Sequence, residues 1–316
     1  MTENWAIATQ GLTKQFERQR AVNQVDLQVE AGAVYGLMGP NGAGKTTLIR
    51  LLAMAETATT GEIYLFGDRL IPDSSNLKLK RYLGYLPDDF PLYEDLTVWN
   101  YLDYFARLYF LADSRRRQRL EDVLELVQLT SKRHSRIATL SRGMKQRLSL
   151  ARTIIHEPLL LLLDEPVSGL DPLARHQFRE IIKVLQAAGM TILISSHVLS
   201  DLAELCTAIG IMELGCLVES CDLPTLYERR AQRHIEITVL EDLAALIPLV
   251  QSFAEVKHWQ PLTDRLGLKL TFSGDTEAGA NLLRSLILAG IPVTSFQTIQ
   301  EDLESIFLNL GHQQVS

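Results

Sequence analysis

A complete phosphate-binding motif lies near the start of the sequence, where residues 39–46 match G-x-x-x-x-G-K-[ST] at every fixed position. Glycines let the backbone curl so that successive N–H groups point at phosphate oxygens, and a following helix adds its positive dipole end. We expect Lys45 to approach the β- and γ-phosphates and the Thr46 hydroxyl to ligate Mg²⁺. The motif therefore predicts a nucleoside triphosphate site. Its expected contacts are Gly39, Pro40, Asn41, Gly42, Ala43, Gly44, Lys45, Thr46 and Thr47.

Two adjacent carboxylates follow a run of leucines. Asp164 and Glu165 come directly after Leu160–Leu163, which reads as a buried strand. We expect this strand to deliver Asp164 to the Mg²⁺ site. Glu165 is then placed to orient the attacking water and to accept its proton as a general base. An acidic pair at a strand end is otherwise an ordinary polar boundary, but its combination with the phosphate motif favours the catalytic interpretation.

Strands and helices alternate around these motifs. An apolar run precedes the Gly-rich loop and a helical segment follows it, which is the opening of a nucleotide-binding α/β unit. Strands are predicted at 33–38, 159–163 and 190–195, and helices at 46–55, 96–112, 116–129 and 172–188. Buried strands that alternate with helices indicate a mainly parallel sheet covered on both faces. The predicted fold class is therefore α/β, of the P-loop nucleotide-binding type.

The sequence changes in character after residue 215, and a second domain is predicted there. Its elements follow the order strand, helix, strand, strand, helix, strand, the split βαβ arrangement of ferredoxin-like domains. They are predicted at 235–240, 242–251, 253–259, 266–272, 276–289 and 292–297, with a last helix at 301–310. We expect a nucleotide-binding domain over 1–224, a polar linker over 225–232 and a small α+β domain over 233–316.

Taken together, these motifs resemble those of the ATP-binding cassette (ABC) ATPases. Leu140–Arg147, which reads LSRGMKQR, is similar to the family signature LSGGQ and stands shortly before the acidic pair. Ser168–Asp171 resembles the D-loop, and His197 resembles the switch histidine. Phe16 occupies the place of the aromatic residue that stacks on adenine. The resemblance covers roughly residues 5–220 and includes a helical subdomain over about 88–155.

The resemblance implies that two cassettes dimerise head to tail, with ATP held between the phosphate motif of one and the signature of the other. The Ser141 hydroxyl and the Gly143 N–H would then contact the γ-phosphate bound by the partner, with Asp171 in the D-loop nearby. His197 would donate a hydrogen bond to the γ-phosphate. The residues expected to be catalytic are Lys45, Glu165 and His197.

Two parts of the sequence depart from the family pattern. The Gln-loop position is occupied by Asp88. A carboxylate also ligates Mg²⁺, so the predicted metal ligands are Thr46, Asp164 and Asp88. The signature carries Arg142 and Met144 in place of Gly and Gln. Arg142 either adds positive charge near the partner's γ-phosphate or is solvated, and the sequence leaves both open.

The resemblance favours the ATP-hydrolysing subunit of a transporter. The longest aliphatic run, Leu159–Leu163, is too short to span a membrane, and no signal peptide is recognised. We therefore expect a soluble subunit on the cytoplasmic face, joined to separate transmembrane permease subunits and to a second copy or a paralogous cassette. A small domain after a single cassette resembles bacterial export ATPases. The alternative is a soluble ABC ATPase of iron–sulfur assembly, ribosomes or DNA repair.

Composition narrows the partners further. Hydrophobic residues make up 47% and charged residues 22% of the chain, as in globular proteins with a sizeable core. A net charge of −7 argues against a nucleic-acid partner. The 3 cysteines suggest neither a disulfide framework nor a zinc site. Basic residues gather between 114 and 152, where we expect Arg115–Arg119 to lie on solvated helix faces.

Overall fold

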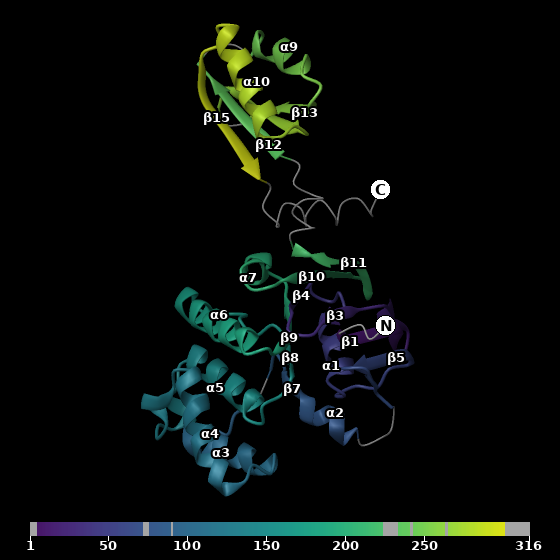
Figure 1. Ribbon diagram of the computed structural model, residues 1–316, viewed down its shortest axis with the longest axis vertical. Coiled ribbons are helices and arrows are strands. Elements are labelled where there is room, and N and C mark those ends of the chain that lie inside the picture. The colour runs from purple at the N-terminus through teal and green to yellow at the C-terminus, as the bar shows by residue number, and fades with distance from the viewer. Residues whose placement is uncertain are drawn as a thin grey trace. The chain divides into compact units, whose positions relative to one another are not determined.

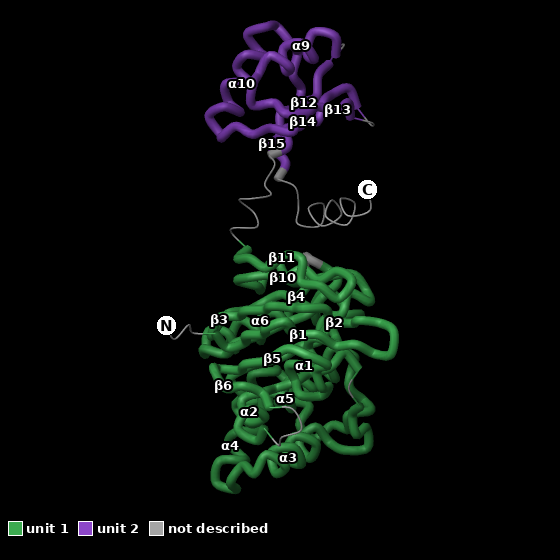
Figure 2. The backbone as a smooth tube through the Cα atoms, turned by 90° about the vertical axis from the view of Figure 1, so that its right-hand side faces the viewer, with its two compact units in different colours: residues 1–223 green, residues 224–316 purple. Residues whose placement is uncertain are grey.

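The computed structural model describes residues 5–71, 76–89, 91–223, 233–240, 243–262 and 265–300. The chain divides into two compact units, residues 1–223 and 224–316 (Figure 2). Each unit has sheets and a hydrophobic core of its own. The predicted linker, 225–232, and the predicted last helix, 301–310, lie outside the described residues.

A six-stranded sheet forms the centre of the first unit, in the order β11-β10-β4-β9-β8-β7. Its strands are β4 (Val34–Met38), β7 (Leu83–Leu86), β8 (Leu160–Leu163), β9 (Thr191–Ser196), β10 (Ala208–Glu213) and β11 (Cys216–Asp222). Neighbours from β10 to β7 run parallel, and β11 pairs antiparallel with β10 at one edge. The three strands β4, β9 and β8 are buried along their whole length, as expected for a parallel sheet covered on both faces.

A second sheet in this unit is antiparallel, in the order β2-β1-β5-β6 with β3 also paired to β1. Its strands are β1 (Trp5–Phe16), β2 (Gln19–Val25), β3 (Gln28–Glu30), β5 (Thr60–Leu65) and β6 (Asp68–Arg69). The tip of the β1–β2 hairpin pairs Phe16 with Gln19. The register of this hairpin therefore decides which side chains its tip presents.

Helices lie on both sides of the central sheet. The helix α1 (Lys45–Leu52) lies on the same side as the antiparallel sheet, whereas α5 (Arg142–Ile154) and α6 (Pro172–Ala187) lie on the opposite side (Figure 1). The helices α3 (Val98–Leu108) and α4 (Asp113–Leu126) pack with α5 as a helical region. Two shorter helices, α2 (Leu77–Tyr82) and α7 (Leu199–Ala203), follow β6 and β9.

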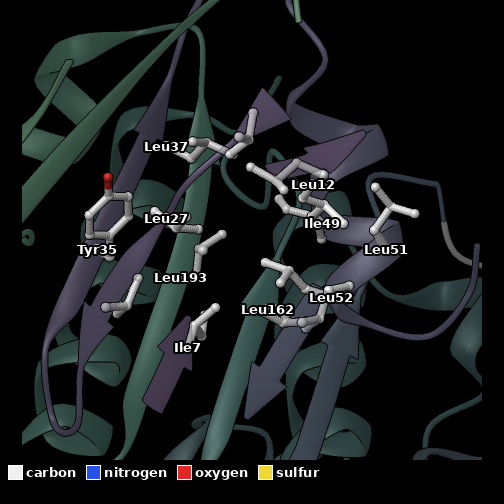
Figure 3. Close-up of a cluster of buried hydrophobic side chains, with 14 of the residues drawn as sticks. Ile7, Leu12, Leu27, Tyr35, Leu37, Ile49, Leu51, Leu52, Leu162 and Leu193 are labelled. Atoms are coloured by element: carbon white, nitrogen blue, oxygen red, sulfur yellow. The ribbon is translucent and has the colours of Figure 1, made fainter. Parts of the chain in front are cut away.

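The main core joins α1 to both sheets of the first unit. Leu12 from β1, Ile49 and Leu52 from α1, Leu162 from β8 and Leu193 from β9 are fully buried in it (Figure 3). Burial of each such side chain contributes about 1.5–3 kcal/mol. The core therefore holds the helix that follows the phosphate motif against the strands that precede the acidic pair and His197.

Two of the arginines expected on solvated faces are engaged in contacts between helices. Arg119 on α4 donates from Nε to the carbonyl of Ile155 (3.1 Å) and from Nη2 to that of Ile154 (2.6 Å), at the C-terminal end of α5. Arg116 forms an ion pair with Asp103 on α3 at 2.8 Å. The prediction of solvated faces is wrong for these two side chains, because α4 packs against both α3 and α5.

The second unit is a four-stranded antiparallel sheet with two helices. The sheet order is β13-β14-β12-β15, from β12 (Arg233–Val239), β13 (Val256–Pro261), β14 (Gly267–Phe272) and β15 (Val293–Gln300). The helices are α9 (Leu246–Gln251) and α10 (Thr276–Leu288). Ile237, Leu268 and Leu270 from the sheet form one core with Leu282 and Leu286 from α10. This is the βαββαβ order that the sequence predicts.

The predicted elements of the first unit are found with their ends shifted by a few residues. The strands β5, β6, β7, β10 and β11 were not predicted, because glycine or charged residues interrupt these segments. Within the described part of the chain, no helix is long and apolar enough to cross a bilayer.

Removal of the Arg119 guanidinium is expected to destabilise the first unit. Hydrogen bonds from a charged donor contribute about 1.5–3 kcal/mol each, and Arg119 is 21% exposed, so we expect Arg119→Met to lower the free energy of unfolding by about 1–3 kcal/mol. Urea unfolding measures this change. Arg117→Met on the same helix is the control, because that side chain is 83% exposed and a surface pair contributes about 0–1 kcal/mol. Equal effects of the two substitutions would contradict the assigned contact.

Candidate functional site

The phosphate motif forms a tight loop between β4 and α1. Gly44 has a φ of 103°, and a Cβ at this position would lie 2.1 Å from the carbonyl oxygen of Ala21. A Cβ at Gly39 would lie 2.3 Å from the carbonyl oxygen of Met212. Both positions therefore require glycine. The helix α1 begins at Lys45, so its first N–H groups lack intrahelical acceptors and are available to an anion.

The ammonium group of Lys45 is held by the chain itself. Its Nζ donates to the carbonyl oxygens of Gly39 (2.6 Å) and Pro40 (3.2 Å), and lies 3.5 Å from Oε1 of Glu165. The side chain is 6% exposed, so its charge is balanced within the site. A phosphate that enters the loop would compete with these oxygens for the same ammonium group.

The carboxylate of Asp164, directly after β8, joins three elements. Its Oδ1 accepts hydrogen bonds from the hydroxyls of Thr46 on α1 (3.2 Å) and Ser195 on β9 (2.8 Å). Burial raises the pKa of this carboxyl group, and the two hydroxyl hydrogen bonds oppose that shift. Among the described residues, nothing forms a hydrogen bond with its second oxygen, Oδ2, which is buried.

Both carboxylate oxygens of Glu165 are engaged. Oε2 lies 2.8 Å from Nδ1 of His197, while Oε1 faces Lys45. The backbone N–H of Glu165 donates to the hydroxyl of Ser195 at 2.9 Å. Glu165 has a φ of 46°, a region that residues other than glycine rarely adopt. Strained backbone of this kind concentrates at functional sites.

A cavity of about 380 Å³ lies beside the phosphate motif, within the range of small-molecule sites. It is lined by the motif residues 41–47 and by Phe16, Gln19, Ala21, Asp88 and Glu165. Phe16 is 42% exposed, and Nζ of Lys14 lies 4.7 Å from the centre of its ring. The structure therefore brings Phe16 and Asp88 to the same cavity as the motif.

Three residues at this site were not predicted, namely Gln19, Ala21 and Ser195. Gln19 lines the cavity because it pairs with Phe16 across the β1–β2 hairpin, and only the strand register indicates this. Ser195 links the carboxylate of Asp164 to the backbone of Glu165. The sequence feature that could have indicated Ser195 is a polar residue near the end of a buried strand.

Three predicted nucleotide contacts lie elsewhere, at the starts of α5 and α6, across the central sheet from α1 (Figure 1). Among the described residues, those that line the cavity do not include Ser141, Gly143 or Asp171. Ser141 and Asp171 are N-caps, and their side chains accept from the N–H groups of Met144 (3.3 Å) and Ala174 (2.9 Å). A Cβ at Gly143 would lie 2.7 Å from Cβ of Ala174, so the two helices pack closely there.

The residues around Asp164 fit a bound Mg²⁺ ion. Magnesium prefers oxygen ligands and is usually held by one or two carboxylates together with phosphate oxygens and water. The site offers the Thr46 hydroxyl and the buried, unpartnered Oδ2 of Asp164. No group of three or more His, Cys, Asp or Glu that suits a metal occurs in the described ranges. A cation here would therefore need phosphate oxygens to complete its coordination.

Comparison of the sequence with those of known proteins identifies the family. Residues 22–168 match the ABC transporter family. The chain is 33% identical over 311 residues to the bacitracin transport ATP-binding protein BcrA of Enterococcus faecalis, which covers 98% of this chain and 97% of the relative. The chain belongs to the ABC transporter ATP-binding proteins. It therefore binds ATP and is an ATPase.

Other relatives of this ABC ATPase agree with the assignment. The daunorubicin resistance ATP-binding protein DrrA3 of Streptomyces coeruleorubidus is 30% identical over 310 residues, 96% of this chain and 95% of the relative. A solved ATP-binding subunit of an ABC transporter matches with a TM-score of 0.64 and 30% identity, over 71% of this chain and 92% of that chain. A dimeric bacterial ABC transporter cassette shares the fold, with a TM-score of 0.62 at 24% identity, over 69% and 98% of the two chains.

Replacement of the buried carboxylate is expected to stabilise the nucleotide-free ATPase. Asp164→Asn keeps an acceptor for Thr46 and Ser195 but removes a buried negative charge, so we expect the Tm at pH 8 to rise by roughly 2–4 °C, or about 1 kcal/mol. The pKa of Asp164 is raised in the folded state. Ionisation of this carboxyl group therefore lowers the free energy of unfolding as the pH rises from the ordinary pKa through the raised one. The gain should therefore shrink on acidification. Thermal unfolding with EDTA measures it, and a lower Tm at pH 8 would contradict the assignment.

Proposed function

We propose that the chain is the ATP-hydrolysing subunit of an ABC exporter that drives separate transmembrane subunits from the cytoplasmic face of the membrane. Three observations support export. The relatives BcrA and DrrA3 are named for bacitracin transport and daunorubicin resistance, and each matches this chain over nearly its whole length. The chain also has a second unit after its single cassette, which those full-length matches include.

The proposed chemistry is hydrolysis of the γ-phosphate of ATP by an attacking water. Glu165 orients this water and accepts its proton, because its carboxylate lies at the edge of the phosphate cavity. Lys45 and His197 contact the two carboxylate oxygens of Glu165. When ATP binds, both side chains contact the γ-phosphate instead. Thr46 and Asp164 would hold Mg²⁺, which would neutralise charge on the β- and γ-phosphates. Phe16 stacks on the adenine.

A head-to-tail pair of cassettes completes the proposed site. The observation that carries this proposal is that the two sets of predicted contacts belong to elements on opposite sides of the central sheet (Figure 1). The phosphate cavity lies on the α1 side of the central sheet, whereas Ser141 and Gly143 lie at the start of α5 on the other side. Ser141 takes the N–H of Met144, whereas the N–H groups of Arg142 and Gly143 precede any intrahelical acceptor and are available to an anion. A second copy or a paralogous cassette would bring its α5 start to this cavity.

The proposed contact with the transmembrane subunits is the surface around α3. This segment follows Asp88 and includes the exposed aromatic side chains of Tyr93 (51%) and Tyr104 (46%). At the end of the same helix, Leu108 is 54% and Phe110 is 90% exposed. Contiguous exposed apolar residues of this kind mark interaction surfaces.

Glu165→Gln tests the general base. The amide keeps the shape of the side chain but cannot accept the proton, so we expect turnover to fall by roughly 10²–10⁴-fold while ATP binding is retained. Steady-state phosphate release and equilibrium nucleotide binding measure the two quantities. Glu180→Gln, which changes an exposed carboxylate on α6, is the matched control. Turnover within a few-fold of wild type would remove Glu165 as the base.

Affinity purification from native membranes tests the transporter assignment. The tagged Glu165→Gln protein, held in its ATP-bound state, is extracted in detergent and its partners are identified by mass spectrometry. We expect a polytopic membrane protein that is lost when the Lys45→Ala variant is used under the same conditions. Recovery of ribosomal, DNA-repair or iron–sulfur assembly proteins without a membrane partner would contradict the proposal and favour the soluble alternative.

Ser141→Ala tests the contact across the dimer. We expect it to weaken ATP-dependent dimerisation of the Glu165→Gln protein while the ATP affinity of the monomer stays within about two-fold. Analytical ultracentrifugation and nucleotide titration measure the two quantities. Ser141 also caps α5, and loss of an N-cap costs about 1 kcal/mol, so Thr97→Ala, which removes the cap of α3, is the control. A larger effect on monomer affinity than on dimerisation would contradict the proposed contact.

A further inference from the structure

We propose that Arg142 is a positioning residue of this ATPase, which holds the turn that follows Glu165 and ties it to the start of α5. The inference rests on the proposed role of Glu165 as general base. Arg142 stands at a signature position where the family pattern has glycine. The side chain is exposed, yet its guanidinium group contacts the chain's own D-loop.

The guanidinium group of Arg142 contacts the backbone at Ser168 and Gly169. Nη2 of Arg142 donates to the carbonyl oxygen of Ser168 at 3.1 Å. A Cβ at Gly169 would lie 2.6 Å from each of Cζ, Nη1 and Nη2 of Arg142, so the guanidinium group occupies the space that a side chain at residue 169 would fill. Gly169 also has a φ of 65°. The backbone conformation therefore favours glycine at residue 169, and a side chain there would displace the guanidinium group.

The turn held by Arg142 is continuous with the catalytic carboxylate. The N–H of Ser168 donates to the carbonyl of Glu165 at 3.1 Å, and that of Leu170 donates to the carbonyl of Val167 at 3.3 Å. Glu165 itself has a strained, positive φ. Because these tight turns leave few free dihedral angles, the position of the Ser168 carbonyl constrains the backbone orientation of Glu165.

The far end of the same loop is anchored by a different arginine. Nε of Arg175 donates to the carbonyl of Leu170 at 3.2 Å, and its Nη1 lies 3.5 Å from Oδ1 of Asp201 on α7. Asp171 then caps α6. Arg175 on α6 therefore holds the carbonyl of Leu170, whereas Arg142 on α5 holds the peptide between Ser168 and Gly169.

The start of α5 is rigid enough to transmit a displacement. Gly143 packs against Ala174 so closely that a Cβ would lie 2.7 Å away, and Ser141 caps the same turn. In the proposed dimer, a nucleotide that displaces this turn also displaces the guanidinium group and the turn after Glu165. In the proposed dimer, each chain contacts one ATP through its signature and the other ATP through its phosphate motif and Glu165. Arg142 thereby links the two ATP sites within one chain.

Amide hydrogen exchange of the nucleotide-free full-length protein tests the positioning directly. We expect Arg142→Met to raise the exchange rate of peptides that cover residues 165–171 by at least several-fold. Arg142→Lys should raise it too, because an ammonium group keeps the charge but lacks the planar fork that covers Gly169. Arg117→Met is the control, since that exposed arginine lies on α4 and should leave this segment unchanged. Unchanged exchange in Arg142→Met would overturn the inference.

Turnover and dimerisation then separate positioning from a direct phosphate contact. We expect Arg142→Met to lower kcat roughly ten-fold, the effect of one charge-assisted hydrogen bond, with KM for ATP within about two-fold. Combined with Glu165→Gln, it should still form the ATP-dependent dimer. Loss of that dimer with recovery in Arg142→Lys would overturn positioning in favour of a charge that contacts phosphate. If Glu165 proves not to be the base, its own Gln variant reports this, and the exchange result still decides whether Arg142 holds the turn.

Discussion

The hydrogen bonds to the buried carboxylate of Asp164 are the interaction on which the rest of this site depends. Through Oδ1, Asp164 joins the start of α1, the end of β8 and the end of β9. A buried carboxylate is costly unless its oxygens are satisfied. Two hydroxyls satisfy one oxygen, and the other is buried with no hydrogen-bond partner among the described residues. This constraint explains why Thr46 and Ser195 occupy strand and helix ends that meet at one edge of the parallel sheet.

The polar groups next to Asp164 are paired with one another when the chain is considered alone. Lys45 is held by two carbonyls and by Glu165, and Glu165 is held in turn by His197. Lys45 and Glu165 are 6% and 14% exposed, so these two groups would be costly to leave unpaired. The same donors are those that a γ-phosphate requires, so in the proposed mechanism ATP would draw Lys45 and His197 away from Glu165 and leave its carboxylate free to accept a proton.

Arginines organise the part of the first unit that lies away from the phosphate cavity. Arg119 satisfies carbonyls at the end of α5, Arg142 satisfies a carbonyl of the D-loop from the start of α5, and Arg175 holds the other end of that loop. Carbonyls in turns and at helix ends lack partners within their own element. A long arginine side chain reaches such carbonyls from a neighbouring helix. The helix α5 is therefore held at its start by Arg142 and at its end by Arg119.

The sequence by itself determined the phosphate loop, the acidic pair, the alternation of strands and helices and the βαββαβ order of the second unit. These features are local, because a motif or a hydrophobic period is complete within one segment. Only the tertiary structure decided that Gln19 lines the cavity, that Ser195 supports Asp164 and Glu165, and that Arg119 and Arg142 are held by carbonyls. Each of these contacts joins segments well separated along the chain or across a strand register, and the path of the backbone between them decides which side chains meet.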